Sequence, residues 1–395
     1  MTDIERPDGV AGPKPPTIGN QIESEKPMSQ NESDESQKRS VRRPKLSRRV
    51  VNIGDRNFTW LLKTVAWCTV ALFVGMILYI GQIGWLSLKT NGFGFFIGSD
   101  WNPPMERFGA APFLVGTIAS SLIAILIATP VSVGTALFLK ELAPRRIAAV
   151  VGFLVELLAA IPSVVYGLWG VLVLAPIMRD SIQPVIAYWL GPGTLFATGL
   201  GHGLTAIAYP FLIVLNAVGA TDVSLVSLSD HMTGFAQALL DGPPLGLGLM
   251  TAGIVLAIMI IPTVTAISRE VFMTVPDAVR EGALGLGATR WEMIRLALLK
   301  SSRAGLIGAI ILGLGRAIGE TMAVTMVIGN RNEIPKSLFE PAQTMASVIA
   351  NEYNESDGLH LSSLALVGLT LFFVSLMVNL LARAIVRWLE RGVRA

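Results

Sequence analysis

Cysteine and histidine are scarce in this sequence. Its 395 residues include one cysteine, Cys68, and three histidines. A single cysteine cannot form an internal disulfide or a cysteine-based metal site. No Ser/His/Asp or metal-ligand constellation appears, and the nucleotide-binding pattern G-x-x-x-x-G-K-[ST] is absent. We therefore expect a protein that is not an enzyme, with no metal site and no cofactor bound by this chain.

Charge is also scarce, because only 15% of the residues are charged whereas 52% are hydrophobic. A soluble chain of this length would need more charge to cover its surface. Several uncharged apolar runs reach the length of about 18 residues that marks a membrane-span candidate. The composition thus predicts an all-α, polytopic membrane protein.

Six runs are predicted to span the membrane, within a membrane domain at 60–392. They cover residues 64–86, 112–139, 148–176, 245–268, 304–328 and 359–386. Arginine and lysine are concentrated in the loops at 140–147 and 269–303 and at the C-terminal end, whereas 329–358 holds five acids and two bases. The positive-inside rule then places both termini in the cytoplasm. We expect a multi-pass protein of the bacterial inner (plasma) membrane.

The N-terminal segment differs from the rest of the chain. Residues 1–55 are predicted to form a disordered cytoplasmic tail, because a segment so rich in Pro, Ser, Glu, Asn and Gln cannot bury enough apolar surface. Residues 38–49 hold seven bases and no acid. Since this cluster directly precedes the first span, we expect it to bind anionic membrane lipid and not nucleic acid. No apolar stretch occurs before about residue 64, so no cleavable signal peptide is expected.

One further stretch, at 195–217, is apolar enough to cross the membrane. The loops at 140–147 and 269–303 are both expected in the cytoplasm, so the chain between them must cross an even number of times. Two crossings are already assigned, and a single extra one would break this parity. We therefore expect residues 180–244 to form an external or re-entrant insertion, in which protein or a water-filled cavity covers the backbone.

The cytoplasmic loop at 269–303 has strong helix signals. The string TVPD at 274–277 is typical of a helix start, with a threonine cap and an early proline. Gly287 is suited to the left-handed conformation that ends such a helix. The string TRWE, which begins at Thr289, is a capping box for a second helix. The loop is thus predicted to form two short helices around a glycine corner; the alternative is an ordinary linker between spans.

The string EGALGLGATRW at 281–291 resembles the EAA loop of ABC importer permeases. In that family the loop inserts into a groove of the ATP-hydrolysing subunit. The resemblance places Glu281 at the acidic position of the motif and Gly287 at its turn glycine. It implies that Glu281, Ala283, Gly287 and Thr289 couple this chain to an ATPase. The segment TPVSVGTALFL at 129–139 also resembles the second span of type I importer permeases.

The predicted fifth span carries a charge pair. Arg316 lies at its midpoint, and Glu320 is four residues further on, which in a continuous helix places both on one face. A central arginine in a span is costly and needs a protein interior or a water-filled cavity. One interpretation is a buried ion pair that fixes helix packing. The other is an anion path, because the planar guanidinium fork suits tetrahedral oxyanions and keeps its charge at any working pH.

The third span contributes further candidates. Pro162 is expected to kink the helix, because it removes a backbone donor and frees the carbonyl four residues earlier. Ser163 either faces the substrate path or bonds to its own backbone. Glu156 is a second intramembrane acid, which either pairs with Arg316 or lines the vestibule of the path.

Two strings resemble phosphate importer permeases of the PstC type: GRAIGETMAV at 315–324 and AIPSVVYGLWG at 160–170. The resemblance implies the six-helix, MetI-like architecture of type I ABC importers, and it implicates Arg316 and Glu320 in phosphate passage. It also implies four kinds of partner. These are a homologous PstA-like permease, two PstB-like ATPase subunits that bind ATP and magnesium, an external PstS-like phosphate-binding protein, and membrane lipid.

Two rival functions remain at this point. An importer of sulfate or molybdate would also use an arginine, because all of these substrates are tetrahedral anions. A secondary transporter driven by an ion gradient would show inverted repeats and broken helices in matching positions. No clear repeat is visible in the sequence, and such a protein would have no use for the loop at 281–291.

Overall fold

The computed structural model describes residues 53–185, 242–243 and 245–394. The predicted tail, apart from its last residues, and most of the predicted insertion at 180–244 lie outside the described residues. The chain divides into two units, Met1–Val70 and Ala71–Ala395. The described part of the first unit is the beginning of helix α2 (Ile53–Asn91). The contacts reported below belong to the second unit.

Six helices in the described residues are long and apolar enough to cross a membrane. They cover Asn57–Asn91, Ala111–Leu142, Ser163–Val185, Leu249–Met273, Arg290–Ile318 and Gly358–Arg387. Each overlaps one predicted span, although the limits differ. Two of the differences are the most informative. The third begins at Ser163 and not at 148, and the fifth ends at Ile318 and not at 328. Both differences reflect breaks in the helices.

The spans are built from α-helices extended by short π-helical turns. Their segments are α4 (Ala111–Leu137) with η2 (Phe138–Leu142), α6 (Ser163–Trp169) with η3 (Gly170–Leu174), α7 (Ala175–Ile177) and η4 (Met178–Ile182), α11 (Leu249–Met273), α13 (Arg290–Glu292) with η5 (Met293–Leu299) and α14 (Lys300–Ile318), and α17 (Gly358–Arg394). Shorter elements are α3 (Gly94–Ile97), β1 (Trp101–Asn102), η1 (Pro103–Met105), β2 (Arg107–Phe108), α5 (Arg145–Ala159), α12 (Asp277–Gly285), α15 (Met322–Val327), α16 (Met345–Glu352) and η6 (Tyr353–Glu355).

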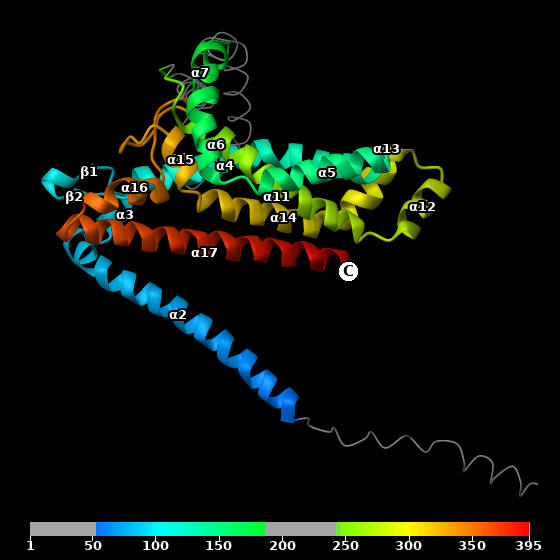
Figure 1. Ribbon diagram of the computed structural model, residues 1–395, viewed down its shortest axis with the longest axis horizontal. Coiled ribbons are helices and arrows are strands. Elements are labelled where there is room, and N and C mark those ends of the chain that lie inside the picture. The colour runs from blue at the N-terminus through cyan, green and yellow to red at the C-terminus, as the bar shows by residue number, and fades with distance from the viewer. Residues whose placement is uncertain (1–52, 186–241, 244, 395) are drawn as a thin grey trace, which may run out of the picture. The chain divides into compact units, whose positions relative to one another are not determined.

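Helix α11 is the central element of the bundle. Helices α4, α5 and α14 pack beside it, and α17 packs along α14 (Figure 1). Val255, Leu256 and Ile260 of α11 are completely buried. A helix that is apolar on nearly all sides is expected at such a position, because other helices and not lipid surround it.

Polar groups join neighbouring spans where their backbones approach. The buried Ser132 hydroxyl of α4 donates a hydrogen bond to the Ile261 carbonyl of α11 at 3.2 Å. On the other side of the bundle, the Ser87 hydroxyl of α2 lies 2.9 Å from the Ser363 hydroxyl of α17. The Ser362 hydroxyl donates to the Ile83 carbonyl at 2.7 Å. Small hydroxyl residues of this kind allow helices in membranes to pack closely.

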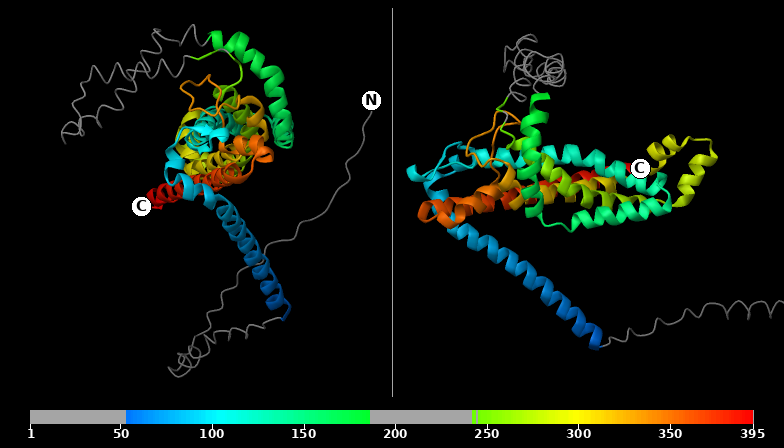
Figure 2. Two further views of the ribbon diagram at one scale, coloured as in Figure 1. Left: turned by 90° about the vertical axis from the view of Figure 1, so that its left-hand side faces the viewer. Right: turned by 45° about the horizontal axis from the view of Figure 1, so that its top comes forward.

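One end of the bundle carries a small antiparallel hairpin, the only pairing of two strands in the described residues. Its strands β1 and β2 pair Trp101 with Phe108. The hairpin and α16 lie at this end, whereas α12 and α13 lie at the opposite end (Figures 1 and 2). The hairpin belongs to an apolar cluster with Phe113 of α4 and Leu364 of α17.

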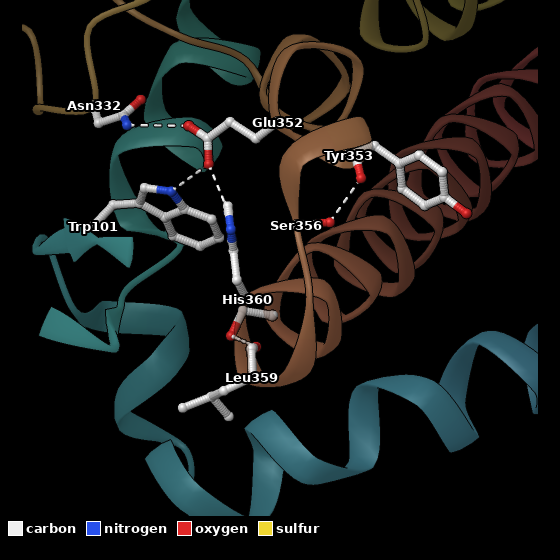
Figure 3. A network of polar contacts seen from close by, with 8 residues as sticks. Trp101, Asn332, Glu352, Tyr353, Ser356, Leu359 and His360 are labelled. Carbon is white, nitrogen blue, oxygen red and sulfur yellow. Dashed lines mark hydrogen bonds and ion pairs between the residues drawn. The ribbon is translucent and has the colours of Figure 1, made fainter. Parts of the chain in front are cut away.

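A polar network fixes this hairpin to the bundle (Figure 3). Glu352 Oε2 accepts a hydrogen bond from Trp101 Nε1 at 2.9 Å and lies 2.9 Å from His360 Nε2. Glu352 Oε1 accepts a hydrogen bond from Asn332 Nδ2 at 3.3 Å. The His360 ring stacks on Phe108 with 5.5 Å between ring centroids. One carboxylate thus ties together the hairpin, the loop after α15, and the start of α17.

Candidate functional site

The third span is broken immediately before the segment that crosses the membrane. Helix α5 ends at Ala159, and Pro162 precedes α6 in an extended conformation, with φ −59° and ψ 141°. Proline has no N–H, so it cannot donate to the carbonyl of Leu158. The Tyr166 hydroxyl donates to that carbonyl at 2.8 Å, and the Ile161 amide donates to it at 3.3 Å. The predicted kink at Pro162 is therefore a complete break, and Tyr166 bridges it.

The fifth span is broken as well, which corrects the predicted geometry of the charge pair. Helix α14 ends at Ile318, and α15 begins only at Met322. Arg316 consequently lies in the last turn of α14 and not at the middle of a continuous helix. Glu320 lies between the two helices, where its Oε1 accepts a hydrogen bond from the Ala323 amide at 3.3 Å. The prediction that the pair shares one helical face is wrong, because Gly319 ends the helix before Glu320 is reached.

The segments that follow the two breaks pack against each other. A Cβ atom at Gly167 of α6 would lie 2.8 Å from Met326 Sδ and 3.0 Å from Ala323 Cα of α15. Contacts this short exclude a side chain at position 167 unless a neighbour moves. The absence of a side chain at Gly167 is thus what lets the two broken spans cross closely. We call this region, residues 158–170 and 316–327, the crossing.

Arg316 is exposed at the edge of the crossing. A positive charge in the last turn of a helix is stabilised by the helix dipole. In the described ranges, no carboxylate forms an ion pair with Arg316 within 4.0 Å. The exposed guanidinium is thus not occupied by a carboxylate of the described residues, and an oxyanion can accept its donors in bidentate fashion.

Two further residues were predicted to line the path, Ser163 and Glu156. They lie on opposite sides of the break in the third span. Ser163 is half-buried at the first position of α6. Glu156 is exposed on α5, before the break. Of the two alternatives for Glu156, an ion pair with Arg316 is not formed in the described part of the chain. The structure therefore gathers Arg316, Glu320 and Ser163 at the two breaks and leaves Glu156 on a separate helix.

The loop at 269–303 forms the two helices that the sequence predicts. Helix α12 ends at Gly285, and Gly287 adopts a φ of +85°. The amides of Gly287 and Ala288 bond back to the carbonyls of Leu284 and Ala283 at 3.0 and 3.2 Å. This pair of bonds is the Schellman pattern that a left-handed glycine permits.

The capping box at Thr289 is also confirmed. The Thr289 hydroxyl accepts from the Glu292 amide at 3.3 Å, and Glu292 Oε2 accepts from the Thr289 amide at 2.8 Å. The predicted cap at Thr274 is wrong. Helix α11 extends to Met273, so Thr274 belongs to its C-terminal end and donates its hydroxyl to Val271. Glu281 is exposed on α12, and Ala283 is half-buried.

Two groups of polar residues escaped the sequence analysis. Arg280 of α12 contacts Glu141 of η2, and Glu352 contacts Trp101 and His360. The contacts of Arg280 with Glu141 and of Trp101 with Glu352 join residues far apart in the chain, so spacing could not reveal them. The available signal was their residue type, since acids flanking apolar spans need partners when they are buried. In the part of the chain that is described, no three His, Cys, Asp or Glu side chains cluster as a metal site would require.

Comparisons with known proteins identify relatives over most of the chain. Residues 128–395 match the family model of binding-protein-dependent transport system inner membrane components. The chain is 41% identical to the phosphate transport system permease protein PstC of Pasteurella multocida, over 78% of this chain and 83% of that protein. It is 39% identical to the PstC protein of Mesorhizobium japonicum, over 84% and 89%. A solved inward-facing MetNI methionine ABC transporter is 15% identical, covers 73% of this chain and 99% of its own, and has a TM-score of 0.45.

The predicted fold class is confirmed, because the described residues are mostly helical with six candidate spans and the family model covers residues 128–395. The family description also supports a multi-pass location in the inner membrane. The chain therefore belongs to the binding-protein-dependent transport system inner membrane component family and, within it, to the PstC type of permease.

Proposed function

We propose that this chain forms half of the membrane path of an ATP-driven importer of inorganic phosphate. The observation that carries the proposal is that Arg316 is exposed at the crossing of two broken spans. A charged guanidinium at membrane depth is costly unless it serves a path or a cavity. Phosphate has several oxygens that can accept hydrogen bonds from the planar fork of the guanidinium. The PstC relatives, which are named as phosphate transport permeases, support phosphate over other anions.

The broken helices give the path its local structure. Non-helical backbone at membrane depth must face protein or water and not lipid. The exposed side of the crossing would then face a second permease subunit of similar sequence, with the phosphate path between the two. In this arrangement Arg316 attracts the anion, and Ser163 is close enough to the break to add a donor. Glu320 holds the start of α15 and so shapes the path without binding the anion itself.

The proposed energy source lies on partner subunits. The sequence lacks a nucleotide-binding loop, so ATP and magnesium would bind to two ATPase subunits. The exposed Glu281 on α12, together with Ala283, Gly287 and Thr289, forms the surface on which one of them docks. An external binding protein would deliver phosphate, and both termini of this chain would be cytoplasmic. Nucleotide binding would shift the bundle between two arrangements for which the ATPase dimer has different affinities.

The test must distinguish the proposal from two alternatives, which are a different oxyanion as substrate and an ion gradient as energy source. Sulfate or molybdate would satisfy the same arginine, and broken helices also occur in secondary transporters. Uptake of labelled phosphate, sulfate and molybdate is measured in right-side-out membrane vesicles, or in proteoliposomes of the full complex, with ATP inside and the binding protein outside. We expect phosphate uptake that requires ATP and persists when ion gradients are dissipated. Uptake that follows an ion gradient without ATP, or that favours sulfate, would contradict the proposal.

A further inference from the structure

The two-helix loop at 269–303 is seated on the ends of three spans. Val275, two residues before the start of α12, packs in an apolar cluster with Ala136 of α4, Phe272 of α11 and Leu306 of α14. Phe272 is completely buried, and Val275 is 7% exposed. The base of the loop is therefore continuous with the bundle, although most of the surface of α12 is exposed.

Arg280 of α12 adds polar contacts to this apolar cluster at the base of the loop. Its Nη2 donates to the Phe272 carbonyl at 2.8 Å, which is one of the carbonyls left without a helical partner at the end of α11. The same nitrogen lies 3.4 Å from Glu141 Oε1, on the π-helical end of the second span. Nη1 donates to Asp277 Oδ1 at 3.2 Å within α12. One guanidinium thus contacts α12, α11 and η2.

This contact is more buried than most of the other charges of the loop. The side chains of Arg280 and Glu141 are 13% and 12% exposed, whereas Arg290, Arg295 and Lys300 are exposed. Removing one partner from a buried ion pair leaves the other charge without compensation, so such pairs hold their elements firmly together. The pair with Asp277 is weaker, because that carboxylate is 81% exposed and is screened by water.

The spans held by Arg280 behave as one packed body. Helices α4 and α11 share the main core, in which Ala124 and Ala128 of α4 lie against the buried face of α11. The bond from Ser132 to Ile261 joins the same two helices nearer to the loop. A displacement of α12 at its Arg280 contact is consequently passed to both spans and not absorbed by the short connection at Thr274–Pro276.

We infer that Arg280 is a positioning residue of this transporter, which transmits movement of α12 to the second and fourth spans through Glu141 and the Phe272 carbonyl. The inference rests on the proposed function, in which an ATPase subunit moves α12. Arg280 itself contacts neither the substrate nor, in this role, the nucleotide. Loss of the contact should leave the ATPase docked but should disconnect its cycle from the spans.

The first test measures the connection itself and does not depend on the substrate. Cys68 is the single cysteine, so Cys68→Ser provides a background for two spin labels, one at Ala278 on α12 and one at Val131 on α4, which are both exposed. Distances are measured in the reconstituted full complex, with and without nucleotide. With Arg280 present we expect one narrow distribution in both states. In Arg280→Gln we expect it to broaden and to change with nucleotide.

The second test measures the ratio of phosphate transported to ATP hydrolysed. We expect Arg280→Glu and Glu141→Arg each to lower this ratio by about tenfold, and the double charge swap to restore most of it. Arg295→Gln, a change of an exposed arginine in the same loop, should leave the ratio unchanged. Co-purification with the ATPase confirms that each variant still assembles, which separates a lost connection from a misfolded chain.

The outcomes distinguish this inference from the proposed function. Unchanged label distances in Arg280→Gln, or an unchanged ratio in Arg280→Glu, would overturn the role of Arg280. A double swap that is as defective as the single variants would overturn the role of the pair with Glu141. If the complex transports no phosphate but the label distances respond as expected, the substrate assignment fails while the role of Arg280 stands.

Discussion

Arg316 and Glu320 lie on opposite sides of a helix break: Arg316 ends α14, and the Glu320 carboxylate accepts a hydrogen bond from the Ala323 amide at the start of α15. The acid is thus occupied by the protein backbone, and the guanidinium is exposed. A continuous helix would have paired the two charges and neutralised the arginine. The break separates their roles, so the two residues should respond differently to substitution.

Arg316→Gln should abolish phosphate uptake, because an amide supplies hydrogen bonds but no charge. Arg316→Lys should keep only part of the uptake, because lysine keeps the charge but loses the planar fork. Labelled phosphate uptake in vesicles is the measurement, and Arg331→Gln on the loop after α15 is the matched control. Co-purification with the partner subunits should be unaffected. Loss of assembly in Arg316→Gln would instead favour a packing role for this arginine.

Glu320→Ala should destabilise the protein by about 1 kcal/mol, because it removes the carboxylate that accepts from the first turn of α15. Glu320→Gln retains an acceptor oxygen, so it should be close to neutral in thermal unfolding of the purified complex. An ion pair with Arg316 predicts a different result, since Gln would then be nearly as harmful as Ala. Equal losses in the two variants would therefore count against the capping role.

Glu281→Lys should eliminate phosphate uptake although the chain still inserts into the membrane. Glu281 is exposed on α12, so reversing its charge should perturb the proposed ATPase surface and not the fold. Uptake and recovery of the ATPase with the purified chain are measured together. Glu270→Lys, a charge reversal of another exposed acid in the same cytoplasmic loop, serves as the control for charge alone. Full uptake by well-expressed Glu281→Lys would refute the docking role.

Gly167→Val should destabilise the crossing by about 1–3 kcal/mol, because the new side chain would collide with Ala323 and Met326. Gly308→Ala in α14 is the control, since a Cβ at that position meets no atom within 4 Å. Alanine is also the better helix former, so Gly308→Ala should be neutral or slightly stabilising. Thermal unfolding of both variants tests the difference, and equal stability would show that α6 and α15 do not pack tightly.

Glu352→Ala should destabilise the end of the bundle that carries the hairpin by about 1–3 kcal/mol, because it leaves the Trp101 indole N–H and the Asn332 amide without their acceptor. Glu355→Ala, which removes an exposed acid three residues further on, is the matched control. Hydrogen exchange of the amides at 101–108 reports the local effect. If the amides at 101–108 are equally protected from exchange in the two variants, the network does not stabilise the hairpin.

The features determined by the sequence alone are those that depend on local patterns. Long apolar runs located the six spans, because the bilayer requires a minimum length of apolar helix whatever its neighbours are. The glycine corner at Gly287 and the capping box at Thr289 were also predictable, since their hydrogen bonds close within a few residues. Arg316 and Glu281 were named as candidate residues because each lies in a short string that resembles a family motif, and such a string can be recognised without knowing the fold.

Only the tertiary structure decided how the third and fifth spans end and meet. The sequence predicts a kink at Pro162 but not a complete break, and at 319–321 it predicts that the helix continues through Glu320. The breaks are stabilised by distant groups: Tyr166 serves the Leu158 carbonyl, and Gly167 receives α15. The Arg280 contact with Glu141 likewise joins two loops that only folding brings together. Such contacts depend on packing between spans, and no local pattern contains that information.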